Sequence, residues 1–353
     1  MNTIQLYGWS EALTRLKQES NYKDSMHGRV MVTHKTCYEV ISEAGHYTCE
    51  LTGNMLYGRD ISEYPCTGDW VIFQPFDDNK GIIVDRLPRE RTLYRKKNGT
   101  VADKQAIASY VDKAFIVQSL DDNFNVRRAE RFMVQVLEEN IQPILVLNKA
   151  DLGVDRQEIE KQMEHIARQI PVFFTSIHQP QTILRLRESI SEGETVVFVG
   201  SSGVGKSSLV NALCEKSVLL TSDISLSTGK GRHTSTRREM ILMDGSGVLI
   251  DTPGVREFGL AIGNPDSLGE ILEISDYAKS CRFKDCEHTG EPGCAVIDAV
   301  NRGVLDPKVY ESFLKLRRET WHFSASEHEK RKKDKSFSKL VDEVKKRKMN
   351  RYD

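Results

Sequence analysis

The chain of 353 residues is too long for one typical hydrophobic core, so two or three domains are expected. Apolar residues make up 39% and charged residues 29%, values that are ordinary for a globular protein. The first residues contain no apolar core flanked by basic side chains, and no stretch is long and apolar enough for a membrane span. With seven cysteines and no secretory signal, a disulfide framework is not expected, and the sequence predicts a cytoplasmic protein without a membrane partner.

The formal net charge of −1 hides a strongly basic carboxy-terminal tail. Between Lys330 and Arg351, eleven Lys or Arg residues stand against three Asp or Glu, a net charge of +8 that leaves −9 for the rest of the chain. Such an imbalance often marks a segment that meets a polyanion. A solvated end without a partner would produce the same pattern, so the tail alone does not decide between the two.

Residues 27–98 have the pattern of a small β-barrel. The segments RVMVTH, YEVISEAGHYTCELTG, GDWVIFQP and GIIVDRLP alternate in polarity or form apolar runs, and Gly, Asn and Asp separate them. Several short strands in so few residues favour an oligonucleotide-binding (OB) type of β-barrel. From Arg86 to Lys97, six basic residues accompany one acidic residue, which suggests RNA contact, although most such clusters are only hydrated surface.

From about residue 110 the pattern changes to alternating strands and helices. AFIVQSL, PILVL, PVFFTS and ETVVFVG are short apolar runs, and EMILMDGSGVLIDTPG has the pattern of a hairpin. One face of the helix expected after the first run is apolar, with residues Ala129, Phe132, Met133, Val136 and Leu137. This pattern predicts an α/β domain, with a mostly parallel sheet covered by helices on both faces.

The strongest chemical signal is a phosphate-binding loop between an expected strand and an expected helix. Its residues are Gly200, Ser201, Ser202, Gly203, Val204, Gly205, Lys206 and Ser207, followed by Ser208. Glycines allow backbone N–H groups to turn toward a phosphate at the positive end of the helix. We expect Lys206 to reach the β- and γ-phosphates of a nucleotide and to act in catalysis, and the Ser207 hydroxyl to bind Mg²⁺.

Two further segments are typical of a switch that senses the γ-phosphate. LIDTPG ends an expected strand at Asp251, which would hold Mg²⁺ through water, and the Gly254 N–H would contact the γ-phosphate. The second segment, STGKGRHTST, lies in the chain between the phosphate loop and LIDTPG. Its Thr234 or a neighbouring Thr would close over Mg²⁺ and the γ-phosphate. Either segment taken alone would also be compatible with an ordinary turn or loop.

The stretch NKAD, which follows an expected strand, predicts that the nucleotide is a guanine nucleotide. Asp151 would accept hydrogen bonds from guanine N1–H and the amino group, which adenine cannot offer, and this disfavours an ATPase. Asn148 would brace the site, and the stem of Lys149 would pack on the ring. FFTSI resembles the loop whose backbone N–H approaches guanine O6, with Ser176 at its centre, although TSI is a loose version of that loop.

The base-reading motifs precede the phosphate loop in the chain, which is the reverse of the usual order. In the usual numbering of GTPase motifs, NKAD is G4, the TSI loop G5, the phosphate loop G1, the Thr234 segment G2 and the Asp251–Gly254 segment G3. The motifs therefore follow the order G4-G5-G1-G2-G3. Because domain termini often lie close together, a chain can be cut at one loop and rejoined elsewhere without loss of the sheet. We therefore expect a circularly permuted GTPase domain, in which the Asp251 segment leads directly into whatever follows.

A Cys/His cluster follows the GTPase motifs. The spacing Cys281-x4-Cys286-x-His288-x5-Cys294 gives three thiolates and one imidazole, a closed tetrahedral set suited to one structural Zn²⁺. Four protein ligands leave no open position for catalysis. The other cysteines, expected to be core or neutral, are Cys37, Cys49, Cys66 and Cys214. The helix and turn signals after the cluster predict a small helical zinc-binding domain.

These motifs together resemble the bacterial ribosome-small-subunit-dependent GTPase A family, over nearly the whole chain. The matching segments are GSSGVGKSSLVNAL, STGKGRHTST, DTPGVREFGL and the Cys/His cluster. On this basis we expect an amino-terminal segment and barrel over residues 1–100, the permuted GTPase domain over 101–262, the zinc domain over 263–328 and the basic tail over 329–353.

The resemblance implies a factor that binds GTP or GDP, the small ribosomal (30S) subunit and its 16S rRNA, and assists late maturation of that subunit. A monomer is expected, because nothing in the sequence demands more. It also implies that the subunit stimulates GTP hydrolysis and that hydrolysis accompanies release. Val255 stands where many GTPases place a water-orienting Gln, and Val cannot hydrogen-bond water. The resemblance points to His233 as the catalytic replacement, against the alternative that His233 is only an exposed loop residue.

Two other functions remain open from the residues alone. The protein could be an RNA-binding scaffold that holds nucleotide without turnover, but a static ligand needs no switch pair such as Thr234 and Asp251. It could instead act on the large ribosomal subunit, against which the zinc cluster and the barrel argue.

Overall fold

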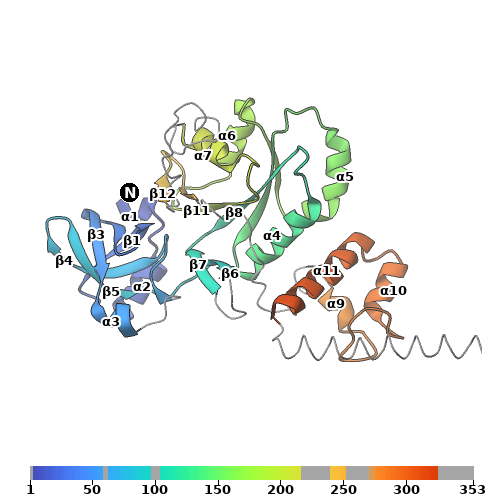
Figure 1. The fold of residues 1–353 in the computed structure, drawn as a ribbon, viewed down its shortest axis with the longest axis horizontal. Coiled ribbons are helices and arrows are strands. Elements are labelled where there is room, and N and C mark those ends of the chain that lie inside the picture. Colours follow the sequence, from blue (N-terminus) through green and yellow to red (C-terminus); the bar gives the residue numbers. More distant parts are fainter. Residues whose placement is uncertain are drawn as a thin grey trace, which may run out of the picture. The chain divides into compact units, whose positions relative to one another are not determined.

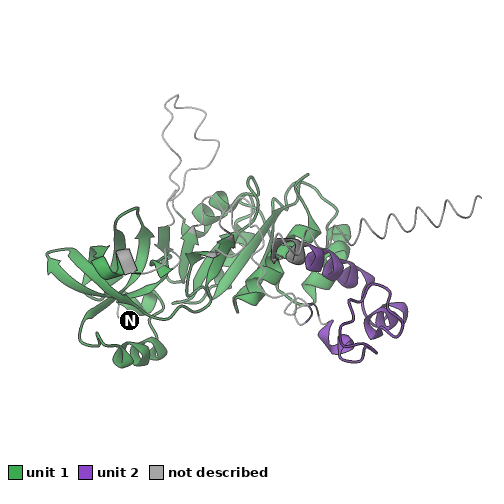
Figure 2. Ribbon diagram, turned by 60° about the horizontal axis from the view of Figure 1, so that its bottom comes forward, with its two compact units in different colours: residues 1–96, 104–259 green, residues 97–103, 260–353 purple. Residues whose placement is uncertain are grey.

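The computed structural model describes residues 3–58, 63–96, 104–215, 239–251, 269, 272 and 274–324. The chain divides into two compact units, which Figure 2 colours separately. Unit 1 contains residues 1–96 and 104–259, and unit 2 contains residues 97–103 and 260–353. Among the described residues, no helix has the length and apolar character needed to cross a membrane.

The amino-terminal part of unit 1 is a closed barrel (Figure 1). Its strands are β1 (Met26–Thr33), β2 (Tyr38–Ser42), β3 (Gly45–Leu51), β4 (Trp70–Asp77) and β5 (Lys80–Arg86). They pair in the order β1-β2-β3-β5-β4, and β4 also pairs with β1, which closes the barrel. The pair β3–β5 is parallel and the other pairs are antiparallel. This confirms the barrel that the short alternating segments predicted.

Short helices accompany the barrel. They are α1 (Thr3–Leu6), α2 (Glu11–Glu19) and α3 (Gly53–Gly58). Ser10 begins α2, because its hydroxyl accepts a hydrogen bond from the N–H of Leu13 at 3.3 Å. A two-stranded sheet of β6 (Leu93–Lys96) and β7 (Lys104–Ala108) lies between the barrel and the next strand in the chain.

The rest of unit 1 is an α/β domain, as the sequence predicted. Its strands are β8 (Lys113–Ser119), β9 (Gln142–Asn148), β10 (Val172–Thr175), β11 (Thr195–Val199), β12 (Glu239–Leu242) and β13 (Val248–Asp251). The order β10-β9-β8-β11-β13 is parallel throughout, and β12 adds to it as the predicted antiparallel hairpin with β13. Its helices are α4 (Val126–Glu138), α5 (Arg156–Ala167), α6 (Pro180–Glu188) and α7 (Lys206–Cys214).

The two faces of this sheet pack against different helices. Phe115 and Val117 of β8 join one apolar cluster with side chains from α6 and α7. The side chains between them in the strand point to the opposite face, against which α4 packs through its contacts with β8 and β9. The sheet is therefore buried on both faces, which explains why its strands read as nearly continuous apolar runs.

The barrel and the α/β sheet are joined within unit 1. Strand β1 pairs with β12 at Val32 and Glu239, which merges the two sheets at that point. The fully buried guanidinium of Arg29 donates to the backbone carbonyl of Gly68 in the barrel and to the hydroxyl of Thr195, the first residue of β11. Strand β11 leads directly into the predicted phosphate loop.

Unit 2 is small and helical where it is described, as the turn and helix signals predicted. Its helices are α9 (Ser275–Ala278), α10 (Ala295–Asn301) and α11 (Pro307–Ser324). The predicted Cys/His cluster lies on the segment between α9 and α10 and at the start of α10.

Candidate nucleotide and metal sites

The predicted nucleotide residues gather at the carboxyl end of the parallel sheet. Asn148 is the last residue of β9, Thr175 ends β10, and the phosphate loop follows β11. The carboxyl ends of parallel strands form one edge, and ligands of open α/β sheets bind there. Segments that are far apart in the chain therefore meet at this edge.

The phosphate loop takes a backbone path that two of its glycines make accessible. At Gly200 φ is +149°, and a Cβ atom there would stand 2.4 Å from the carbonyl oxygen of Val117. At Gly205 φ is +92°, and a Cβ atom would stand 2.3 Å from the amide nitrogen of Asn148. Side chains are excluded at both positions, so the loop can lie directly against β8 and the base-reading motif.

The side chain of Lys206 folds over the loop at the start of α7. Its ammonium group donates to the carbonyl oxygens of Gly200 at 2.7 Å and Ser201 at 2.6 Å. The rest of the loop is placed as follows: Ser202 and Gly203 are exposed, Val204 is buried, and Ser201, Gly205, Ser207 and Ser208 are partly buried. Ser207 and Ser208 lie in the first turn of α7, where the helix N-terminus favours anions.

Asn148 connects the base-reading motif to the phosphate loop. Its side chain is 3% exposed, and its amide group donates to the carbonyl oxygen of Val204 at 2.8 Å. Its amide oxygen accepts from the hydroxyl of Thr175 at 3.3 Å. One buried side chain thus links the ends of β9 and β10 to the phosphate loop.

Lys149 and Asp151 follow Asn148 at the same edge of the sheet. The ammonium group of Lys149 donates to the carboxylate of Asp121, just after β8, at 2.7 Å. Burial opposes ionisation of Asp121, but hydrogen bonds from Lys149 and Ser119 overcome it and hold the pKa of Asp121 below its usual range. A hydrogen bond from the Ser176 side chain lowers the pKa of the exposed Asp151, so that carboxylate is an acceptor at neutral pH.

The loop after β10 contains Ser176, the residue predicted at the centre of the loop that approaches guanine O6. The N–H of Ser176 donates to the hydroxyl of Thr182 at 3.0 Å, and the Ser176 hydroxyl accepts from the N–H of His178 at 3.1 Å. Ser176 is buried and supports the loop through these bonds.

Several predicted switch residues cannot be placed. His233, Thr234, Gly254 and Val255 lie outside the described residues. Asp251 is the last residue of β13, where its backbone position pairs with Glu239 of β12.

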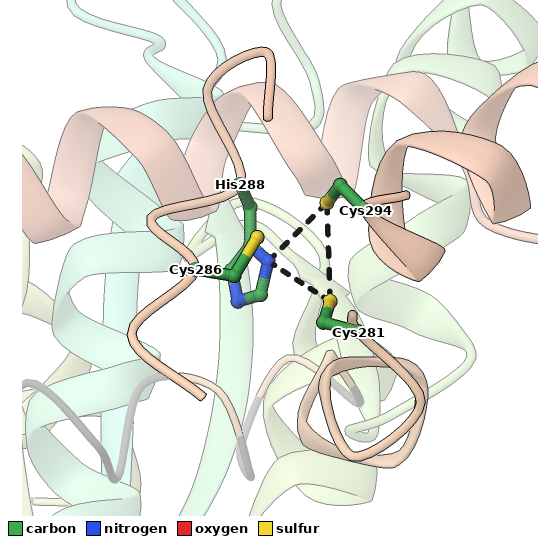
Figure 3. Close-up of side chains that lie close together, drawn as sticks. All are labelled: Cys281, Cys286, His288 and Cys294. Carbon is green, nitrogen blue, oxygen red and sulfur yellow. Dashed lines mark hydrogen bonds between the residues drawn. The ribbon is translucent and has the colours of Figure 1, made fainter. Parts of the chain in front are cut away.

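The four predicted metal ligands converge in unit 2 (Figure 3). The ligand atoms of Cys281, Cys286, His288 and Cys294 all lie within 4.8 Å of one another. The Nδ1 atom of His288 is 3.6 Å from the sulfur of Cys281 and 3.4 Å from that of Cys294, and these two sulfurs are 4.0 Å apart. Ligands about 2.3 Å from a tetrahedral Zn²⁺ are about 3.8 Å from each other, so the set fits one zinc ion.

Neighbouring groups hold this cluster in shape. His288 adopts a positive φ of 57°, and its carbonyl oxygen accepts from the hydroxyl of Tyr310 in α11 at 2.6 Å. The His288 ring lies 6.1 Å from that of Phe313. The cluster is therefore fixed from outside by α11, and its three sulfurs and one nitrogen are the donors that a structural zinc prefers.

Some residues at the nucleotide edge were missed by the sequence analysis. They are Asp121, Arg128, Thr175 and Thr182. Thr175 and Asp121 follow strand ends, and that position could have marked them. Arg128 lies on a helix and Thr182 on another, and no motif identifies either.

The fold and the arrangement of these motifs define a circularly permuted GTPase. Two solved structures support this: YjeQ from Thermotoga maritima matches with a TM-score of 0.64 at 25% identity, covering 84% of this chain and 98% of that one. YloQ, described as a circularly permuted GTPase, matches with a TM-score of 0.61 at 24% identity, covering 87% of this chain and 99% of that one.

The family model described as RsgA GTPase matches residues 86–261. A relative from Bacteroides thetaiotaomicron, named small ribosomal subunit biogenesis GTPase RsgA 1, is 80% identical over 349 residues, which are 99% of this chain and 98% of that protein. The chain belongs to the RsgA GTPase family.

Proposed function

We propose that this GTPase acts in biogenesis of the small ribosomal subunit, where it hydrolyses GTP to GDP and phosphate on stimulation by the subunit and is then released. The name of the relative that matches over nearly the full chain supports the pathway. The observation that carries the nucleotide site is the bridge from Asn148 to Val204, because it couples base recognition to the phosphate loop in the permuted order. The two alternative functions, an RNA-binding scaffold and a factor for the large ribosomal subunit, have no comparable support.

Each nucleotide residue has a proposed role. Asp151 selects guanine, Lys149 packs on the base, and Lys206 turns from the loop carbonyls to the β- and γ-phosphates. Because the N–H of Ser176 is already bonded to Thr182, we propose that the next amide, that of Ile177, meets guanine O6. The phosphate-loop N–H groups between Gly200 and Ser208 hold the polyphosphate.

The hydrolytic step is proposed to use residues on both sides of the nucleotide. Ser207 and Thr234 would bind Mg²⁺, with Asp251 acting through water, and the Gly254 N–H would contact the γ-phosphate. Mg²⁺ would neutralise charge that develops on the phosphates. His233 would orient the attacking water where Val255 cannot.

The Cys/His cluster is proposed to hold one structural Zn²⁺, with Cys281, Cys286, His288 and Cys294 as ligands. We further propose a monomer acting in the cytoplasm, whose barrel and basic tail contact 16S rRNA. The proposed domains are residues 1–100, 101–262, 263–328 and 329–353.

The test is GTP turnover by the purified protein alone and with separated small and large ribosomal subunits at matched salt, with ATP in parallel. We expect strong stimulation by small subunits only, and no turnover of ATP. Equal stimulation by both subunits, or none, would remove the ribosomal part of the proposal. An Asp151→Asn variant that keeps the full preference for GTP over ATP would remove the base-reading part.

A further inference from the structure

Arg128 in the first turn of α4 contacts the phosphate loop. Its Nη1 atom donates to the hydroxyl of Ser201, the second residue of the loop, at 2.8 Å and more weakly to the carbonyl of Asn123 at 3.4 Å. The backbone of Arg128 is fixed as well, since its N–H donates to the side chain of the helix cap Asn125 at 3.0 Å. The guanidinium therefore stands beside the loop on a rigid element.

The charge of Arg128 has no partner of opposite charge among the described residues. Within the described parts of the chain, no carboxylate pairs with Arg128, and its Nη2 and Nε atoms have no hydrogen-bond acceptor. The first turn of α4 contains Arg127 as well and no acidic residue. Cations at a helix N-terminus oppose the helix dipole, so this arrangement costs stability unless an anion is present.

A second cation, Lys206, contacts the same loop residue. Lys206 donates to the carbonyl oxygen of Ser201, while Arg128 donates to its hydroxyl. Both cations bind oxygens of Ser201, so two positive groups stand at one point of the phosphate loop. A planar guanidinium with unused donors is suited to a phosphate group, which it can bind through two parallel hydrogen bonds.

We propose that Arg128 is a phosphate-binding residue of the nucleotide site, supplied by α4 of the same chain, and that it binds the γ-phosphate end of GTP while Ser201 positions its guanidinium. Lysine of a phosphate loop reaches the β- and γ-phosphates. Because the Lys206 ammonium lies against Ser201, the Arg128 side of the loop is at that end of the nucleotide. This inference rests on the proposed guanine-nucleotide site and adds to it a residue that lies outside every nucleotide-binding motif.

The test compares Arg128→Gln with Arg127→Gln, its matched control. Arg127 has the same charge, lies on the same turn and is exposed. Equilibrium binding of GDP and of a non-hydrolysable GTP analogue would be measured for both variants and for Arg128→Lys, together with kcat and KM for GTP and the melting temperature without nucleotide. The analogue should bind about 10- to 100-fold more weakly to Arg128→Gln, the usual range for losing a hydrogen bond to a charged group.

The pattern across ligands separates phosphate binding from support of the loop. We expect a smaller loss for GDP than for the GTP analogue, partial recovery in Arg128→Lys, and changes within about twofold for Arg127→Gln. Equal losses for both nucleotides without recovery by Lys, or an Arg128→Gln variant that matches Arg127→Gln, would overturn the inference. Failure of the wild-type protein to bind guanine nucleotides would instead overturn the proposed function on which it rests.

Discussion

The metal cluster and the nucleotide edge are built in opposite ways. All four residues of the cluster lie between Cys281 and Cys294, and one spacing pattern contains the whole site. The nucleotide edge brings Asn148 to Val204, and Asp121 to Lys149, across long stretches of chain and a sheet of five parallel strands. A local site is encoded in one short stretch of sequence, whereas a dispersed site depends on the fold that brings its residues together.

Loss of one of the four proposed zinc ligands should therefore have the largest effect, and only in unit 2. Cys294→Ser removes a buried ligand, and zinc sites of this type contribute about 10 kcal/mol or more to folding of small domains. We expect loss of zinc, measured by metal content, and loss of amide protection in α10 and α11 by hydrogen exchange. GDP affinity should stay within about twofold.

Cys37→Ser is the matched control, because Cys37 lies in the barrel half of unit 1, far from the cluster in the chain. It should keep full zinc content and normal protection. If Cys294→Ser kept its zinc, or lost GDP binding along with it, the local character of the cluster would be disproved.

At the nucleotide edge, Asn148→Ala should weaken both nucleotide binding and folding. The substitution leaves the carbonyl of Val204 and the hydroxyl of Thr175 without their buried partner, at a cost of about 2–4 kcal/mol in the free energy of unfolding. Because the phosphate loop loses its tie, GDP and GTP affinities should both fall by about 100-fold, measured by titration. Thr175→Val removes only the longer bond and should cost clearly less; equal effects of the two variants would contradict the bridging role of Asn148.

The features that the sequence predicts are local, like the Cys/His cluster, and those that it does not predict are dispersed along the chain. The Cys/His cluster, the phosphate loop, the strand before it and the permuted order were all predictable, because short motifs and apolar runs encode them locally. The pairing of Lys149 with Asp121, the hydrogen bond from Ser176 to Thr182 and the contact of Arg128 with Ser201 were not. They depend on which strand ends lie side by side and on rotamers chosen by packing, and neither leaves a periodic signal.

A weaker, pH-dependent effect is expected at Asp121. Its folded-state pKa is lowered, so its ion pair with Lys149 stabilises the protein above the unfolded-state pKa and is lost as the pH falls through the folded value. Lys149 is 35% exposed, so solvent screening limits the contribution to about 0.5–1 kcal/mol. Asp121→Asn should lower stability by that amount at pH 7 and by less below pH 4, measured by urea denaturation at both pH values. A loss that is the same at both would show that the ion pair is not its cause.

An effect of similar size but opposite sign, a gain in stability, is expected at Gln118. Gln118 lies near the carboxyl end of β8 and is fully buried, and within the described part of the chain neither atom of its amide has a hydrogen-bond partner. An unpaired buried amide costs about 1–3 kcal/mol, so Gln118→Leu should raise the free energy of unfolding by about 1 kcal/mol and the melting temperature by a few degrees. Gln135 is the control: its Oε1 atom is also unpaired, but its amide N–H donates to the carbonyl of Tyr94 at 3.1 Å, so Gln135→Leu loses a bond and should not stabilise. If Gln118→Leu destabilised the free protein, its amide would have a partner in solution. If it stabilised the protein but lowered GTP turnover, the unpaired amide would belong to the nucleotide edge as a functional group whose cost the fold tolerates.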